Sequence, residues 1–236
     1  MGKNKTVESY LYASDKERIV GLVIKMGLAA DSALKDAMEA FATADKVLAA
    51  KVVSSDDEID AVEEEIDLEC LRSIAMRQPV REELRFIFAV LKTITDLERI
   101  GDQSVNIARW VIELKKYPQT AVRPALIDMG DVAGAMLRDA LKAFRTSDGD
   151  MCAEICRRDG ILDEAYSSIF DEFIELMASF KTGDTNTVRA IAAQMWIARH
   201  LERIGDHVTN IAERVYFMDK GESLTKDKQA KLGLWE

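Results

Sequence analysis

The chain has 236 residues, of which 48% are hydrophobic and 31% are charged, and its formal net charge is −10. This length allows one large domain or two of ordinary size, and the composition is typical of a soluble globular protein with a substantial core. The negative charge opposes general binding to nucleic acid or to an anionic membrane surface. The polar N-terminus shows no signal peptide, and no apolar run reaches the roughly 20 residues that span a bilayer. We therefore expect a cytoplasmic protein that does not insert directly into a membrane.

The three cysteines do not indicate a disulfide framework. An odd number cannot all pair, and Cys152 and Cys156 stand four residues apart on one predicted helix. Buried, reduced thiols are the ordinary state of cysteines in a cytosolic protein, and we expect them here rather than a metal or redox site.

The first part of the chain predicts two helices after a loosely ordered lead-in of residues 1–15. Apolar residues recur at helical spacing over about 16–53, which predicts one long helix. Ser54 and Ser55 offer an N-cap for a second helix, because acidic residues follow them as they do in many first turns. That second helix is expected to end near Arg77.

A third, longer helix follows. Pro79 fits its first turn, the helical pattern continues over about 80–116, and Pro118 ends it. A boundary between two domains is expected just beyond, which divides the chain into residues 1–120 and 121–236.

The second half repeats this plan. The sequence Leu-Glu-Arg-Ile-Gly-Asp occurs at residues 97–102 and again at residues 201–206, and Asn-Ile-Ala follows each copy at the same distance. Nine matching positions indicate an internal duplication. Upstream matches at an offset of 103 residues extend it, and they include Met26-Gly27 with Met129-Gly130, Leu34 with Leu137 and Phe41 with Phe144.

The pattern predicts an all-α protein made of two tandem, duplicated, antiparallel three-helix bundles, with helices crossing at roughly 20°. One residue is inserted before the second motif helix, and we expect it in the loop near residues 181–184. No strand pattern competes, because the Asp-Gly pairs at 148–149 and 159–160 fall within helical pattern.

Each half carries two pairs of acidic residues spaced four apart, which puts both carboxylates of a pair on one helix face. Carboxylates are hard oxygen ligands for Mg²⁺, Mn²⁺, Ca²⁺ or iron, and two adjacent pairs can hold more than one ion. The pairs are Asp56 with Asp60, Glu98 with Asp102, Asp159 with Asp163 and Glu202 with Asp206.

These acidic pairs, and the glycines beside them, lower the stability of the helices that contain them. Like charges four residues apart destabilise a helix by about 0.2–0.5 kcal/mol, and Gly101 and Gly205 each cost about 0.5–1 kcal/mol in a helix interior. Because both halves keep both costs, the residues are expected to serve a purpose. The glycines would let a neighbouring helix or a ligand approach closely, and Asn106 and Asn210 extend the same stripe by a turn.

Other interpretations stay open at this point. Glu98 has arginines to pair with, acidic helix faces are usually only solvated, and a twinned motif can preserve a helix crossing. His200 and His207 lie away from the carboxylate stripe, so packed or solvated histidines are favoured over ligands. The Glu-x-x-His signature of di-iron bundles, phosphate-binding loops and nucleophile elbows are all absent from the sequence.

These residues together resemble the PhoU family of bacterial phosphate-transport accessory and phosphate-signalling proteins. The resemblance covers about residues 16–220. It rests on the doubled Leu-Glu-Arg-Ile-Gly-Asp motif, on both upstream Asp-x-x-x-Asp pairs, on Met26-Gly27 and on the segment Arg77-Gln78-Pro79-Val80.

The resemblance implies tandem three-helix bundles, a cytoplasmic location and a homodimer. It also implies multinuclear metal clusters on the bundle surfaces, and it implies no enzyme activity. The metal ligands carried over to this sequence are Asp56, Asp60, Glu98 and Asp102 in one half, and Asp159, Asp163, Glu202 and Asp206 in the other. The ion is left open among iron, zinc, manganese and magnesium. Gln103 stands opposite His207, and Arg109 opposite Glu213, which makes unequal sites an expectation.

The family resemblance further implies a regulator that restrains the phosphate-starvation response and links a phosphate ABC transporter ATPase to a sensor histidine kinase. Two alternatives remain beside it. One is a carboxylate-bridged metalloenzyme, and the other is a helical scaffold without metal whose acidic residues make only ion pairs.

Overall fold

The computed structural model describes residues 2–117, 122–179 and 185–224, with side chains from residue 13 onward. Within these ranges the chain is all-α and contains no strand, so the predicted fold class is confirmed. The helices are α1 (Gly2–Thr43), α2 (Lys46–Ser54), α3 (Asp56–Arg77), α4 (Glu82–Leu114), α5 (Pro124–Thr146), α6 (Met151–Ser179) and α7 (Thr185–Lys220).

The first predicted helix is two helices, and it begins earlier than expected. The lead-in of residues 2–15 belongs to α1. Ala44 then takes a left-handed φ of 54°, and the Asp45 carboxylate accepts hydrogen bonds from the amides of Val47 and Leu48, at 2.8 and 3.1 Å. The apolar periodicity runs through this point, but a side chain that caps the next turn ends one helix and starts another.

Three further local predictions are wrong. The Ser55 hydroxyl donates back to the Val52 carbonyl at 3.0 Å and makes no N-cap bond, although α3 does begin directly after it. Pro79 lies in a loop between Gln78 and Arg81, both with positive φ, and α4 begins only at Glu82. The Asp-Gly pair at 148–149 lies between α5 and α6. The expected insertion near residues 181–184 lies outside the described residues.

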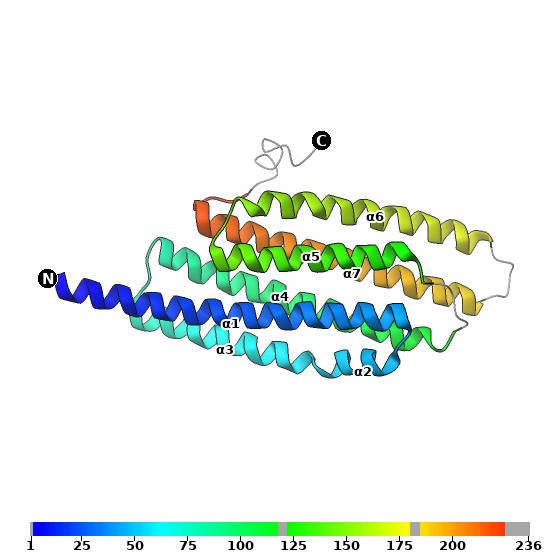
Figure 1. Cartoon of the computed structure of the whole chain (residues 1–236), viewed down its shortest axis with the longest axis horizontal. Helices are drawn as coiled ribbons and strands as arrows, with labels where there is room; N and C mark the ends of the chain where they lie inside the picture. The colour runs from blue at the N-terminus through cyan, green and yellow to red at the C-terminus, as the bar shows by residue number, and fades with distance from the viewer. Residues whose placement is uncertain (1, 118–121, 180–184, 225–236) are drawn as a thin grey trace.

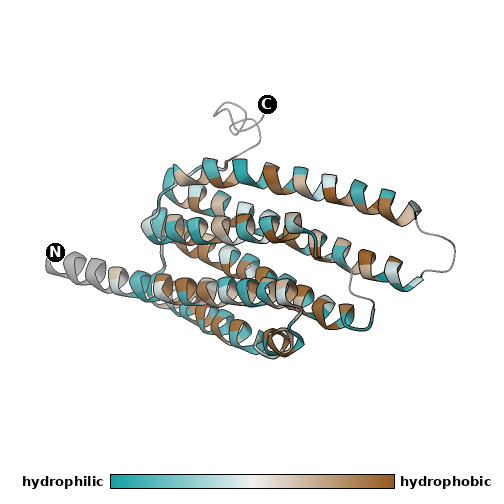
Figure 2. Cartoon of the chain, turned by 45° about the vertical axis from the view of Figure 1, so that its right-hand side comes forward, coloured by the Kyte–Doolittle hydropathy of each residue, from teal (hydrophilic) through white to brown (hydrophobic). Residues whose placement is uncertain are grey.

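The helices form two units, each built on three long helices, that lie side by side with their long axes roughly aligned (Figure 1). In the first unit α1, α3 and α4 pack together, and the short α2 packs on α1 and α4. The second unit consists of α5, α6 and α7. The two units meet where α4 packs on α7 and where α1 packs on α5, and their apolar side chains form one continuous core. Hydrophobic and hydrophilic residues alternate along the helices, as amphipathic packing requires (Figure 2).

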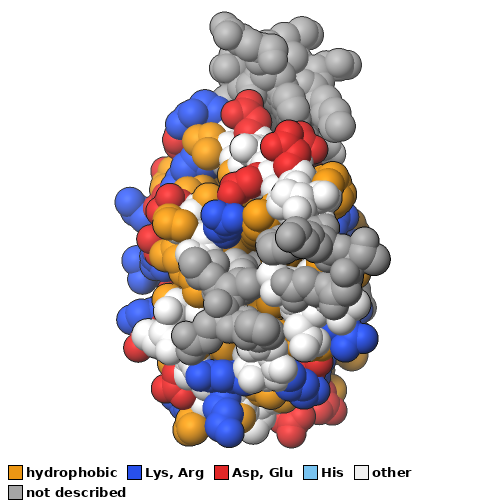
Figure 3. Space-filling model, turned by 90° about the vertical axis from the view of Figure 1, so that its right-hand side faces the viewer, with side chains coloured by type: hydrophobic (Ala, Val, Ile, Leu, Met, Phe, Trp, Pro, Cys, Tyr) orange, Lys and Arg blue, Asp and Glu red, His pale blue; other side chains and the backbone are white. Residues whose placement is uncertain are grey.

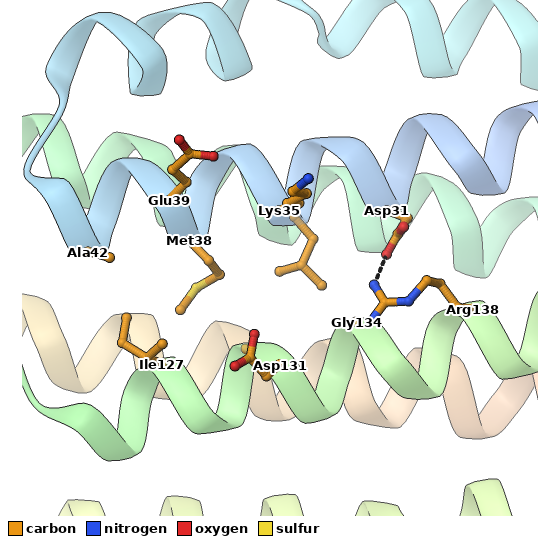
Figure 4. Close-up of a pocket in the computed structure, with 11 residues that line it drawn as sticks. Asp31, Lys35, Met38, Glu39, Ala42, Ile127, Asp131, Gly134 and Arg138 are labelled. Carbon is orange, nitrogen blue, oxygen red and sulfur yellow. Dashed lines mark hydrogen bonds and ion pairs between the residues drawn. The ribbon is translucent and has the colours of Figure 1, made fainter.

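The contact between α1 and α5 shows that the duplication is also a spatial pseudo-twofold. A Cβ added at Gly27 would meet the Leu141 side chain at 2.2 Å, and one added at Gly130 would meet the Met38 side chain at 2.7 Å. These two contacts are equivalent under the 103-residue offset, so each glycine admits a large side chain from the equivalent position of the other half. Beside them lies a groove of about 240 Å³, where Arg138 donates to Asp31 at 2.9 Å (Figure 4).

The contact between α4 and α7 contains a second pseudo-symmetric pair, made of polar side chains. His200 Nδ1 lies 2.7 Å from Gln103 Oε1, and His207 Nδ1 lies 2.9 Å from Asp96 Oδ1, which also accepts from Asn210 at 3.1 Å. An offset of 104 residues converts one pair into the other. The expectation that the histidines are packed rather than ligands is consistent with these bonds.

Removing Asp96 is expected to destabilise this contact. Asp96→Ala would leave both His207 and Asn210 without their acceptor in a largely buried seam, which costs about 1–3 kcal/mol of unfolding free energy. Urea denaturation followed by circular dichroism measures this. The exposed Glu64→Ala on α3 serves as a control and should change stability by less than about 0.5 kcal/mol. Equal stabilities for both variants would contradict the structural role of the seam.

Two smaller expectations are also answered. All three cysteines are buried and free, and burial raises the pKa of each thiol to about 12. Among the helices of the described ranges, none combines the length and apolar character needed to cross a membrane.

Figure 3 looks onto the end of the molecule where α4 ends and α7 begins, and its surface there mixes acidic, basic and apolar side chains.

Candidate functional site

The motif glycines lie at close contacts between the acidic helices. A Cβ at Gly101 of α4 would meet Ile59 Cδ1 of α3 at 2.6 Å. In the second half a Cβ at Gly205 of α7 would meet Asp159 Oδ1 of α6 at 2.6 Å and the Leu162 side chain at 2.8 Å. The predicted close approach is therefore present in both halves. In the second half the side chain that packs against the glycine is itself a carboxylate, that of Asp159.

The first cluster combines acidic side chains of α3 and α4, and we define it as Asp56, Asp60, Glu98 and Asp102. Burial, then the charge of Asp102, raises the pKa of Glu98 above its usual value, and Asp60 adds to this. Burial, then the charges of Asp102 and Asp60, likewise raises the pKa of Asp56. The four residues that the sequence predicted are therefore close enough to repel one another.

Arginine side chains neutralise part of the negative charge of this first cluster. Arg99 Nε lies 3.3 Å from Glu98 Oε2, and its Nη1 donates to Asp102 Oδ2 at 2.9 Å. The Arg109 guanidinium opposes the rise in the pKa of Asp56. The metal-free alternative requires ion pairs of this kind.

Sequence reasoning missed a fifth carboxylate, Glu63 of α3. Burial raises its pKa, followed by the charges of Asp67 and Asp60, and Glu63 in turn raises the pKa of Glu98. Its place seven residues after Asp56 puts it on the same helix face, a signal that was available. The duplication concealed it, because the equivalent residue in the second half is Tyr166.

Basic side chains neutralise less of the negative charge of the second cluster. We define this cluster as Asp159, Asp163, Glu202 and Asp206. Burial and the charge of Asp163 raise the pKa of Asp159 to about 6, Asp206 and Glu202 add to the rise, and the nearby Thr209 opposes it. Burial, then the charge of Asp206, raises the pKa of both Asp163 and Glu202.

Two oxygens of this second cluster have no protein partner. Arg199 donates to Glu202 Oε1 at 2.5 Å, but the buried Oε2 of Glu202 and the buried Oδ1 of Asp159 accept no hydrogen bond. Buried charged oxygens without partners are costly, so such atoms indicate a missing cation or proton. An all-carboxylate donor set matches the preference of hard divalent ions and of iron.

The clusters are not assembled metal sites as they stand. In the described parts of the chain, no three His, Cys, Asp or Glu side chains converge on one point where an ion would sit. Binding an ion would therefore require rotamer changes. The two asparagines of the stripe differ, because Asn106 accepts from Arg109 at 3.0 Å whereas Asn210 donates across the seam to Asp96. The residue types fit a metal, most clearly in the second half.

The raised pKa of Asp159 predicts a pH-dependent stability for chelator-treated protein. The folded pKa of about 6 exceeds the ordinary 3.8, so the folded state binds more protons between about pH 4 and pH 6. Unfolding free energy therefore falls as pH rises through that window. Asp159→Asn should raise stability at pH 7.5 by on the order of 1–2 kcal/mol, after allowance for solvent screening, and change it little at pH 4.

Urea titrations at both pH values measure this difference. Asp171→Asn, on the exposed part of the same helix, is the control and should behave alike at both values. A gain for Asp159→Asn that is the same at pH 4 and pH 7.5 would contradict the assigned cause.

Two similar helical units, each with an acidic helix pair closed by a motif glycine, define a class of duplicated helical-bundle proteins. Comparison with known families places the chain more narrowly. Residues 23–111 and residues 126–215 each match the model of the PhoU domain. The chain belongs to the PhoU family.

Individual relatives match over nearly their whole length. A phosphate-specific transport system accessory protein PhoU homolog of Caulobacter vibrioides is 37% identical, over 94% of this chain and 95% of that protein. The homolog of Clostridium acetobutylicum is 33% identical over 91% and 96%. The crystal structure of PhoU from Pseudomonas aeruginosa superposes with a TM-score of 0.84 at 32% identity, covering 89% of this chain and all of that one. The phosphate transport system regulatory protein PhoU from Streptococcus pneumoniae gives 0.84 at 27% identity.

Proposed function

We propose that this chain is an accessory protein of phosphate transport that works without enzymatic activity of its own. The match to relatives named for that role, over 91–94% of this chain and 95–96% of those proteins, carries the proposal. In this proposal the chain is a cytoplasmic homodimer. It links a phosphate ABC transporter ATPase to a sensor histidine kinase and restrains the phosphate-starvation response.

We further propose that the two carboxylate clusters hold metal ions, with iron, zinc, manganese and magnesium as candidates. Support comes from the partnerless oxygens of Asp159 and Glu202 and from the mutually raised pKa values in each cluster. A bound cation would compensate the repulsion that makes these side chains costly in the metal-free protein. The metal would then stabilise the structure of the surface that contacts partner proteins, and it would not act as a catalyst.

Gene deletion tests the regulatory part. Without this chain, starvation-response genes should become active in phosphate-rich medium, and expression of the intact chain should restore repression. Complementation with Glu202→Ala/Asp206→Ala should restore less repression, whereas Glu64→Ala should restore all of it. Unchanged repression in the deletion strain would refute the regulatory role.

The two alternatives can be weighed against particular contacts. The metal-free scaffold is favoured by one observation, namely that Arg99 contacts both Glu98 and Asp102. It leaves the partnerless oxygens of the second cluster unexplained. A metalloenzyme would draw on histidine ligands, but His200 and His207 are engaged with Gln103 and Asp96 in the seam.

A further inference from the structure

An open cavity of about 460 Å³ lies where the C-terminal part of α4 meets the N-terminal part of α7, toward the right in Figure 1. This volume falls in the range of small-molecule sites, about 300–1,000 Å³. Its lining combines aromatic, cationic and small side chains, which are Arg109, Trp110, Glu113, Tyr117, Arg189, Ala192, Ala193 and Trp196.

The pseudo-twofold explains why a cavity exists here. At the other end of the α4–α7 pair, Phe88 and Phe217 meet edge to face with ring centroids 6.1 Å apart. The 104-residue offset converts these two positions into Ala192 and Glu113. Both residues line the cavity, so an aromatic pair that one end contains is missing at the other.

Two indole rings form one wall of the cavity. Trp110 and Trp196 lie nearly parallel, with an interplanar angle of 4° and ring centroids 6.2 Å apart. Trp196 is 53% exposed, so its ring can be reached from solvent. Flat, accessible indoles are stacking platforms for other planar rings.

The charged side chains among the lining residues are two arginines and one glutamate, so their sum is positive, against the net charge of −10 for the whole chain. Arg109 and Arg189 both line the cavity. Among the described lining residues, the acidic Glu113 is paired with Lys116 at 2.5 Å, accepts from the Tyr117 hydroxyl at 3.0 Å and also feels the charge of Arg189. Guanidinium groups bind phosphate through paired, charge-assisted hydrogen bonds.

From these features we propose that the cavity binds a nucleotide, with the base stacked on Trp196 and the phosphates held by Arg109 and Arg189. A planar ring that carries phosphate matches both halves of the lining, and neither a bare phosphate nor an uncharged aromatic molecule does. Arg109 also acts electrostatically on Asp56, so an occupied cavity would alter the compensation of the first carboxylate cluster. The site is separate from that cluster and does not depend on the proposed regulatory role.

Calorimetric titration of the full-length protein tests the proposal, with ATP, ADP, adenosine and inorganic phosphate as separate probes. We expect ADP or ATP to bind more tightly than adenosine and phosphate do. Trp196→Ala should weaken binding by about 5- to 100-fold, as the loss of one stacked base predicts. Arg189→Gln should reduce the preference of the site for ADP over adenosine, because Arg109 alone then remains to hold the phosphates.

Phe88→Ala is the matched control, because it changes the pseudo-equivalent position at the other end and should leave nucleotide affinity unchanged. Circular dichroism checks that each variant folds, and Trp196→Phe should retain most of the affinity because it keeps a ring. Equal binding of inorganic phosphate and ADP would overturn the proposal, as would tight binding of an acidic, aromatic peptide that nucleotides do not displace. Absence of nucleotide binding at millimolar concentration would also overturn it.

Discussion

Gly205→Ala is expected to destabilise the protein by about 1–2 kcal/mol although alanine is the better helix former. The new Cβ would stand 2.6 Å from Asp159 Oδ1 and 2.8 Å from Leu162 Cδ1, so α6 and α7 must separate or the carboxylate must move. Overpacking of this kind costs about 1–3 kcal/mol and exceeds the gain of about 0.5–1 kcal/mol in helix propensity. Displacement of Asp159 would also lower the affinity of the second cluster for any metal ion that it binds.

Gly160→Ala is the control beside it. This glycine lies next to Asp159 in α6, and nothing lies within 4 Å of its added Cβ. It should stabilise the protein by about 0.5–1 kcal/mol. Thermal and urea denaturation of both variants, with metal content measured in parallel, separates the effects. A Gly205→Ala protein that is stabilised like Gly160→Ala would show that the close contact is not maintained in solution.

Arg99→Ala is expected to raise the metal affinity of the first cluster by about tenfold. Its guanidinium lies about 3 Å from carboxylate oxygens of Glu98 and Asp102, where a competing positive charge opposes an incoming cation by roughly 1 kcal/mol or more. In the second cluster the contacting arginine, Arg199, pairs with the Glu202 carboxylate alone, so this cluster should be the first to fill. Its compensating residue, Arg199, stands opposite Thr95 in the duplication.

Arg203→Ala is the matched control, since Arg203 is the second copy of the motif arginine and is exposed. Stepwise chelator competition with Mn²⁺, followed by electron paramagnetic resonance, resolves the two affinities. Equal affinities in the unaltered protein, together with no change in Arg99→Ala, would contradict the assigned inequality.

The periodicity of apolar residues predicted the helices well because burial of one face is what stabilises them. It could not locate the break at Ala44, where a single capping carboxylate, Asp45, overrides a continuous apolar pattern. Pro79 was misplaced for a similar reason. The left-handed φ values at Gln78 and Arg81 are set by how the chain turns between packed helices, which local sequence does not determine.

The duplicated motif predicted which carboxylates face each other, since equal spacing on two packed helices leaves few other arrangements. It did not predict how each charge is compensated. Arg99 and Arg199 act from different positions of the repeat, and Glu63 has no acidic counterpart, so a search for matching residues passes over all three. The polar seam was also beyond reach, because His200 meets Gln103, and His207 meets Asp96, only when α4 and α7 pack antiparallel.

Elemental analysis of the purified protein tests the central proposal, that the doubled motif holds metal ions in each half. The unaltered chain should carry bound metal. Glu98→Ala/Asp102→Ala should lose the share of the first cluster, Glu202→Ala/Asp206→Ala the share of the second, and the fourfold variant all of it, with helix content retained in circular dichroism. Equal metal content in all four proteins, or none in the unaltered chain after growth with iron, zinc, manganese and magnesium, would contradict it.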